Sequence, residues 1–222
     1  SAFSAGTTVF TTLFPSLSNE VAMTIFAVII LIYTFMGGFK AVCWTDFFQG
    51  ILMLIALLAV PIVIVCTKTL DTSALAQVYS YVDANGQAVE CAFTTNLFGA
   101  SWQEIASGLA WGLGYFGMPH ILVRFMSIEK PSMVKKSATV AIIWVVITLL
   151  AAILIAYYGR MLIGAELLAV GNQKLVFIEL ARDLFPGFIA GLLLAAIIAA
   201  SMSTADSQLL VASSSFTSDI YK

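Results

Sequence analysis

Long uninterrupted apolar runs constrain this chain more than any other feature of its sequence. A helix that crosses a bilayer needs about 20 consecutive, mostly apolar residues. Five stretches meet this requirement, and a sixth is partial because it begins at the first residue. The expected spans are residues 1–14 (partial), 21–38, 47–67, 105–125, 139–158 and 188–211. We therefore expect an all-α polytopic membrane protein, and we interpret both ends of the sequence as cuts through a longer chain.

The composition supports the bilayer as the solvent of this fold. Hydrophobic residues make up 61% of the chain and charged residues 10%, against about 45–50% and about 25% in a soluble domain. A water-soluble fold of this length could not bury so much apolar surface. The net charge of -2 gives no basis for a nucleic-acid partner. The three cysteines form no CxxC pair and no metal-ligand spacing, which disfavours a disulfide or metal framework.

Two polar segments separate the expected spans. Residues 68–101 are expected to form a long loop with turns, which the Asn-Gly pair at 85–86 indicates. Residues 161–186 carry apolar residues at helical spacing, which predicts a short amphipathic helix on the surface. The residues with this spacing are Val176, Leu180 and Leu184.

The basic residues indicate how the spans are oriented. Alternating spans place six lysines and arginines on one side and four on the other. The six are Lys40, Arg124, Lys130, Lys135, Lys136 and Lys222. The loop of residues 127–137 is the most basic, so the positive-inside bias predicts that it is cytoplasmic. Residues 68–101 and 161–186 are then extracellular or periplasmic.

The segment that joins the second and third spans has a glycine pair and a carboxylate. Gly37 and Gly38 predict a helix end, because glycine accepts the left-handed conformation of a helix cap. Asp46 is expected at the start of the next span, where a carboxylate stabilises the helix N-terminus. Two interpretations stay open for Asp46. It either caps this helix, with Lys40 and Trp44 as interfacial anchors, or lies at the cytoplasmic mouth of an ion path.

The expected span at 105–125 contains a helix-breaking motif. Three glycines, Gly114 among them, and Pro119 weaken or kink this helix. Trp111, Tyr115 and Pro119 recur at every fourth position, so they share one face of a helix. Such a stripe is usually packing, but beside a helix break it is a candidate substrate wall, where unwound backbone can bind a zwitterion. His120 is the only histidine and makes no zinc site, so we predict a structural or gating role.

The last expected span is rich in small and hydroxylated residues. Sodium is a hard cation that takes oxygen ligands. The carbonyl near Ala200 and the hydroxyls of Ser203 and Thr204 can supply part of a sodium site, with the remaining oxygens on another helix. Asp206 is costly inside a span unless it has a partner or water. The serines at 213–215 are explained more simply by hydrogen bonds to carbonyls one turn earlier.

Three runs of the sequence carry a resemblance that covers essentially the whole chain. They are GGFKAVCWTDFFQ (37–49), WGLGYFGMPHILVRFM (111–126) and AASMSTADSQLLVASSSFTSDIYK (199–222). Together they resemble the sodium/solute symporter family, and within it the sodium/proline symporter branch. The resemblance implies a protein of 13 helices with the inverted-repeat core of the leucine-transporter fold. This chain would contribute about helices 4–9, a partial core.

The resemblance also implies roles for individual residues. The implied substrate-binding residues are Trp111, Gly114, Tyr115, Met118 and Pro119. The implied sodium ligands are Ala200, Ser203 and Thr204, with Asp46 and Asp206 as candidate carboxylates of the sodium path. The sequence departs from the branch at two places. Met118 stands where the branch more often has Gln, which bears on the substrate. Asp206 stands where the branch often has a hydroxyl, which bears on ion number or release.

The implied function is sodium-coupled secondary active transport of a small organic solute, the amino acid L-proline, across the cell membrane by alternating access. Sodium is the co-transported ion, and the bilayer and the solute are the expected partners. Alternatives are symport of another solute, a sensor module of a signalling protein and a channel. An intramembrane enzyme would need a paired catalytic set, and the sequence has one histidine and neither HExxH nor GxSxG.

Overall fold

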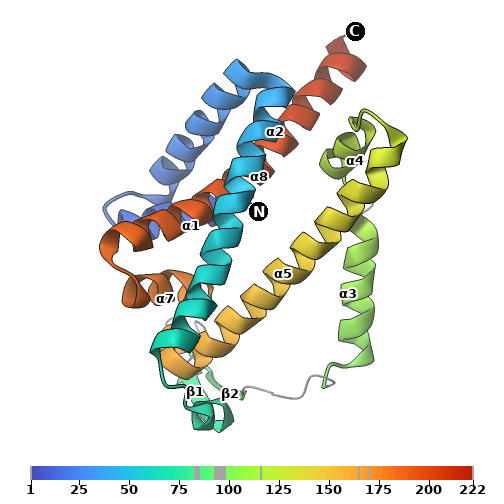
Figure 1. Cartoon of the computed structure of the whole chain (residues 1–222). Coiled ribbons are helices and arrows are strands. Elements are labelled where there is room, and N and C mark those ends of the chain that lie inside the picture. The colour runs from blue at the N-terminus through green and yellow to red at the C-terminus, as the bar shows by residue number, and fades with distance from the viewer. Residues whose placement is uncertain are drawn as a thin grey trace. The chain divides into compact units, whose positions relative to one another are not determined.

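The computed structural model of the chain is mostly helical (Figure 1). It describes residues 2–82, 86–92, 99–115, 117–164, 166–169 and 171–221. Ser1 and Lys222, and the parts of the expected loops and of the 105–125 span at 83–85, 93–98, 116, 165 and 170, lie outside the described residues. Within them, three helical stretches are long and apolar enough to cross a membrane: Asn19–Thr67, Pro131–Ile163 and Gly187–Tyr221. The chain is therefore an α-helical membrane protein at this level of detail.

The elements follow one another along the chain in the following order. They are α1 (Ala2–Leu13), α2 (Asn19–Thr67), η1 (Thr72–Ala76), β1 (Val78–Val82), β2 (Ala88–Ala92), α3 (Trp102–Tyr115), α4 (Pro119–Met126), α5 (Pro131–Ile163), α6 (Glu166–Ala169), η2 (Gln173–Leu175), α7 (Val176–Leu184), α8 (Gly187–Phe216) and the π-helical turn η3 (Thr217–Tyr221). They group into two compact units. The first contains residues 1–56, 116–134 and 191–222, and the second contains residues 57–115 and 135–190.

In the first unit, α2 is interrupted at the predicted glycine pair. Gly38 has φ 60° and ψ −170°, which is not helical. L-residues with a side chain rarely adopt this φ, so glycine is required here. The chain reverses direction at this point (Figure 1). Asp46 lies inside the second segment rather than at its N-terminus, so the expectation that it caps a helix is wrong. The second helical segment begins just after Gly38. Asp46 therefore lies beyond the first turn, where the free backbone N–H groups of a helix are found.

The core of the first unit joins α1, α2 and α8. Phe26, Ile30 and Ala205 are buried, with relative exposures of 0–2%. Phe10 packs on Phe26 with ring centroids 6.1 Å apart. At Gly6 the helices approach so closely that a Cβ there would lie 2.6 Å from Cζ of Phe26. Small residues permit such close packing between membrane helices, where van der Waals contact drives association.

The second unit contains most of α5 with α7 packed against it. A Cβ at Gly159 in α5 would lie 2.3 Å from Cγ2 of Val176 at the start of α7. Ile178, Leu180 and Ala181 of α7 are buried. A short helix with one buried face thus occupies the segment where the sequence predicts an amphipathic helix.

The segment expected to be a long loop contains a small sheet. Strands β1 and β2 pair antiparallel, with Tyr79 opposite Cys91 and Tyr81 opposite Val89. Arg160 of α5 holds this hairpin. Its Nη2 donates to the carbonyl of Gln77 at 2.9 Å, and its guanidinium lies 4.1 Å from the centroid of the Tyr79 ring. The segment expected to be a long loop with turns therefore also contains an antiparallel hairpin, and the exposure of the side chains alternates along β1.

Candidate ion site

One turn of α8 brings together the three oxygens predicted to bind sodium. The Ser203 hydroxyl donates to the carbonyl of Ala200 at 3.1 Å, and the Thr204 hydroxyl donates to the same carbonyl at 3.2 Å. Helical spacing produces this cluster, because residues three and four positions apart share a face. The same bonds are the ordinary back-bonding of hydroxyls in a membrane helix. The cluster is thus a preformed set of oxygens that an ion can engage by reorienting two hydroxyls.

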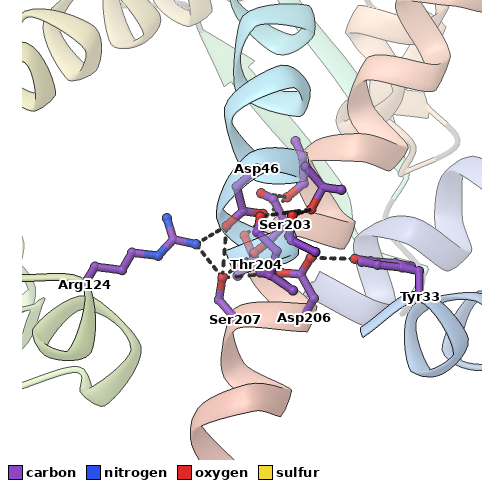
Figure 2. A network of polar contacts seen from close by, with 11 residues as sticks. Tyr33, Asp46, Arg124, Ser203, Thr204, Asp206 and Ser207 are labelled. Atoms are coloured by element: carbon purple, nitrogen blue, oxygen red, sulfur yellow. Dashed lines mark hydrogen bonds and ion pairs between the residues drawn. The ribbon is translucent and has the colours of Figure 1, made fainter. Parts of the chain in front are cut away.

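Asp206 has the partner that its burial requires. Its relative exposure is 0%, and the Tyr33 hydroxyl of α2 donates to its Oδ2 at 2.5 Å (Figure 2). The Ser207 hydroxyl lies 3.3 Å from its Oδ1. A buried carboxylate without hydrogen-bond donors would carry a large desolvation cost. The contact with Tyr33 offsets part of this cost and ties α8 to the first segment of α2.

Asp46 forms an ion pair with an arginine of α4. The Nη2 of Arg124 binds Oδ2 of Asp46 and also donates to Oγ of Ser207, the latter at 2.5 Å. Ser207 Oγ in turn donates to the carbonyl of Ser203 at 2.8 Å and lies 3.3 Å from Oδ2 of Asp46. Figure 2 shows Arg124 reaching toward Asp46 and Ser207, with Asp206 on the side of the network that faces Tyr33. Helices α2, α4 and α8 therefore meet in one polar network, the ion-site network: Tyr33, Asp46, Arg124, Ala200, Ser203, Thr204, Asp206 and Ser207.

Three buried side-chain oxygens of α2 have no hydrogen-bond partner among the described residues. They are Oγ1 of Thr34 and two atoms that can only accept hydrogen bonds, Oδ1 of Asp46 and Oε1 of Gln49. The Asp46 side chain is only 10% exposed. Buried polar atoms are normally satisfied, so each exception calls for an explanation. The Asp46 and Gln49 atoms are acceptors without donors, and an unpartnered oxygen acceptor suits a hard cation.

A cavity of about 510 Å³ adjoins the network within the first unit. Arg124 and Ser207 line it on the network side, and His120 and Cys43 line it further along. The hydroxylated run Ser213, Ser214 and Ser215 of α8 completes its polar lining. Arg124 also lines a second pocket of about 340 Å³, together with Asp46 and Ser127. The arginine side chain therefore borders open space on more than one side.

The predicted substrate residues do not all lie on one helix. Trp111 and Tyr115 share α3, with ring centroids 5.0 Å apart in an edge-to-face arrangement. Gly114 lies between them, with nothing within 4 Å of the position of a Cβ. The expected single span is interrupted at Met118, just before Pro119. Met118 is the extended N-cap of α4 and Pro119 its first residue. The prediction that Pro119 shares a helix face with the two aromatic residues is therefore wrong, because it begins a separate helix.

Three members of the network escaped prediction: Tyr33, Arg124 and Ser207. Arg124 was counted only as an orienting charge. Arg124 lies within the expected 105–125 span, and an ionisable residue inside a membrane span is by default a functional candidate, so that rule identifies it. Ser207 follows Asp206 directly, so it could have been included with that carboxylate. Nothing in the sequence distinguishes Tyr33 from other aromatic residues of its span.

All members of the ion-site network except Tyr33 lie within the three runs that carry the family resemblance. The model of the sodium:solute symporter family matches residues 1–222. The chain belongs to the sodium:solute symporter family. Members of this family are membrane transporters rather than enzymes, so the expected family and membrane location are confirmed.

Individual relatives agree with this family assignment. The chain is 44% identical to sodium/proline symporter 2 of Staphylococcus saprophyticus over 203 residues, which are 88% of this chain and 37% of the relative. It is 40% identical to the sodium/proline symporter of Staphylococcus aureus over 223 residues, which cover 100% of this chain and 42% of the relative. No solved structure matches the chain. The chain thus spans about two fifths of the length of these curated relatives.

Proposed function

We propose that this chain forms the sodium-binding part of a transporter that couples the uptake of a small organic solute, L-proline, to sodium entry. The observation that carries the proposal is the oxygen cluster on α8. The hydroxyls of Ser203 and Thr204 lie 3.1 and 3.2 Å from the carbonyl oxygen of Ala200. The proposal extends to the whole transporter that contains this chain, because the relatives are more than twice as long.

The donor set suits sodium as the transported ion. It consists of carbonyl, hydroxyl and carboxylate oxygens, which hard cations prefer. Sulfur and imidazole, which favour transition metals, are absent from the ion-site network. Asp46 and Asp206 add negative charge on two helices near the α8 cluster. We propose that the α8 cluster binds sodium and that the two carboxylates form the path by which it leaves toward the cytoplasm.

The proposed substrate residues come from α3 and from the start of α4. They are Trp111, Gly114, Tyr115, Met118 and Pro119. Discontinuous membrane helices expose backbone groups that can bind a charged solute such as an amino acid. Met118 is extended and a new helix begins at Pro119, and this interruption supports the assignment. L-Proline is the substrate named for the relatives, and Met118 is the residue we expect to decide between proline and another solute.

Coupling requires that sodium and solute favour the same state of the transporter. A ligand shifts an equilibrium between two states only by its difference in affinity for them. If sodium binding at α8 stabilises the substrate-binding state, the solute must raise the affinity for sodium by the same factor. Alternating access would then release both on the cytoplasmic side.

The test measures uptake of radiolabelled L-proline into proteoliposomes that contain the whole transporter, with and without an inward sodium gradient. The Ser203→Ala/Thr204→Ala double variant should raise the sodium concentration for half-maximal uptake by about tenfold or more, since two ligands are lost. Thr148→Ala is the matched control, because its hydroxyl makes the same kind of back-bond to Trp144 in α5. It should leave the sodium dependence unchanged.

Each outcome separates the parts of the proposal. Uptake of another solute under the gradient, without proline uptake, keeps sodium symport and rejects proline. Sodium-dependent uptake that is unchanged in the double variant rejects the α8 site alone. The absence of gradient-driven uptake of any solute rejects the symporter and favours a sensor module.

A further inference from the structure

We propose that Arg124 is a resident cation that alternates with sodium at the Asp46 carboxylate and the Ser207 hydroxyl, and thereby sets the affinity of the transporter for sodium. This inference rests on the proposed function and assigns a role to a residue outside the predicted site. The arginine lies on α4, whereas its two partners lie on α2 and α8. It therefore connects the ion-site network to a third helix.

The contacts of Arg124 are those a small cation would make. Its Nη2 binds Oδ2 of Asp46 and lies 2.5 Å from Oγ of Ser207. Ser207 Oγ is within 3.3 Å of both carboxylates. A sodium ion that binds Asp46 here would seek the same two oxygens. One Nη2 group and one ion cannot occupy this position together, so they compete for it.

The charges of the network indicate what this competition changes. With both carboxylates ionised, Asp46 and Asp206 contribute two negative charges and Arg124 one positive charge, which leaves one negative charge. Withdrawal of Arg124 leaves two. Nearby opposite charges strongly favour cation binding in a medium of low dielectric constant. The position of the arginine therefore decides whether the network attracts cations weakly or strongly.

The arginine binds only one of the two oxygens of the Asp46 carboxylate. Its side chain is 10% exposed, and its Oδ1 has no hydrogen-bond partner among the described residues. An arginine in a structural ion pair commonly binds a carboxylate through two parallel N–H···O bonds. Here a single nitrogen bridges Asp46 and Ser207. The pair is thus one that an incoming cation can replace while gaining a further ligand in Oδ1.

The Arg124 side chain also borders open space into which it can move. Its side chain is 48% exposed, and it borders the cavity of about 510 Å³. The serine hydroxyls of that cavity, Ser213 to Ser215, can accept hydrogen bonds from a guanidinium, which has five N–H donors. Asp46 is held inside a helix, whereas Arg124 has a long side chain with free space beside it. Exchange with sodium therefore needs a change of rotamer rather than a movement of helices.

The test measures equilibrium binding of ²²Na⁺ to the purified whole transporter in lipid nanodiscs, alongside sodium-dependent uptake. Arg124→Gln removes the competitor and its charge, so the sodium concentration for half-saturation should fall by about tenfold. Arg124→Lys keeps a charge without the planar fork and should fall between wild type and Arg124→Gln. Lys130→Gln is the control, because it removes one positive charge from the segment that follows α4, and it should change half-saturation less than about twofold.

A second arm tests whether the effect passes through Asp46. In an Asp46→Asn background the change Arg124→Gln should no longer increase sodium affinity, since the shared carboxylate is gone. If Arg124→Gln does not fold, Arg124→Lys decides by the same measurement. If the wild type binds sodium but the arginine variants bind it no more tightly, this inference is overturned. The proposed sodium symport is unaffected by that result. Wild-type protein that binds no sodium overturns both.

Discussion

The Tyr33 hydroxyl donates a 2.5 Å hydrogen bond to Oδ2 of Asp206, and this contact joins the first segment of α2 to α8. Tyr33→Phe would leave a fully buried carboxylate without this donor. Hydrogen bonds to charged groups contribute about 1.5–3 kcal/mol to stability. We expect a lower unfolding temperature for the purified transporter, followed by intrinsic tryptophan fluorescence. Tyr158→Phe is the control, because the structure gives its hydroxyl no hydrogen bond to the described residues. Equal losses in both variants would contradict the prediction.

Gly6 is a packing position of α1. Gly6→Ala places a methyl group 2.6 Å from Cζ of Phe26, a side chain only 1% exposed that cannot move aside. Overpacking of this kind costs about 1–3 kcal/mol. Thermal unfolding should show this loss, whereas Gly191→Ala in α8, where a Cβ meets nothing within 4 Å, should show none. A destabilised Gly191→Ala protein would mean that the effect is not specific to the contact with Phe26.

Arg160 fixes the β-hairpin to α5. Its Nη2 bonds the carbonyl of Gln77, and its guanidinium lies over the ring of Tyr79. Arg160→Gln should raise the hydrogen-exchange rates of the Val78–Val82 amides by about tenfold or more, because a charge-assisted bond and a cation–π contact are lost. Lys174→Gln removes a charge from η2 and should leave these amides protected. Unchanged exchange in Arg160→Gln would show that the hairpin stands without this contact.

The stability of the first turn of α3 should depend on pH. Glu104 accepts hydrogen bonds from the Ser101 N–H at 2.7 Å and the Ser101 hydroxyl at 2.9 Å, and these bonds lower its pKa below the ordinary 4.5. A lowered folded-state pKa means that the stabilisation is complete above 4.5 and is lost as pH falls through the folded-state value.

Hydrogen exchange of the first turn of α3, corrected for intrinsic rates, measures this dependence. Protection should be constant above about pH 5 and fall as the pH is lowered below 4.5 in the wild type. Glu104→Gln keeps an acceptor for the Ser101 N–H but cannot titrate, so its protection should not change over this range. A wild-type profile as flat as that of the variant would remove the carboxylate from this role.

Local features of the fold were predictable where a position requires a backbone conformation that only one residue type readily adopts. The glycine pair predicted the break in α2, because Gly38 takes a φ that other residues avoid. The hairpin was missed although an Asn-Gly pair and the alternation in Val-Tyr-Ser-Tyr-Val both indicate strands. Between membrane spans, polar residues favour a loop interpretation, and this outweighed the weaker period-two signal.

The ion site was likewise predictable only in part. The cluster on Ala200, Ser203 and Thr204 follows from spacing within one helix, so it could be predicted. The contact of Arg124 with Asp46 joins residues 78 positions apart, and that of Tyr33 with Asp206 joins residues 173 apart. Which helices lie together depends on packing of the whole unit, and one sequence without an alignment does not supply it.

The unpartnered Oε1 of Gln49 and Oδ1 of Asp46 have a thermodynamic consequence. Two buried acceptors without donors make the ion-free protein less stable than its packing alone would allow. A cation that engages either atom binds the folded chain and not the unfolded one. At a concentration 100 times its dissociation constant, such a ligand adds about 2.7 kcal/mol to the free energy of unfolding. The melting temperature would then rise with the logarithm of sodium concentration, so that heat denaturation reads out ion occupancy without any transport.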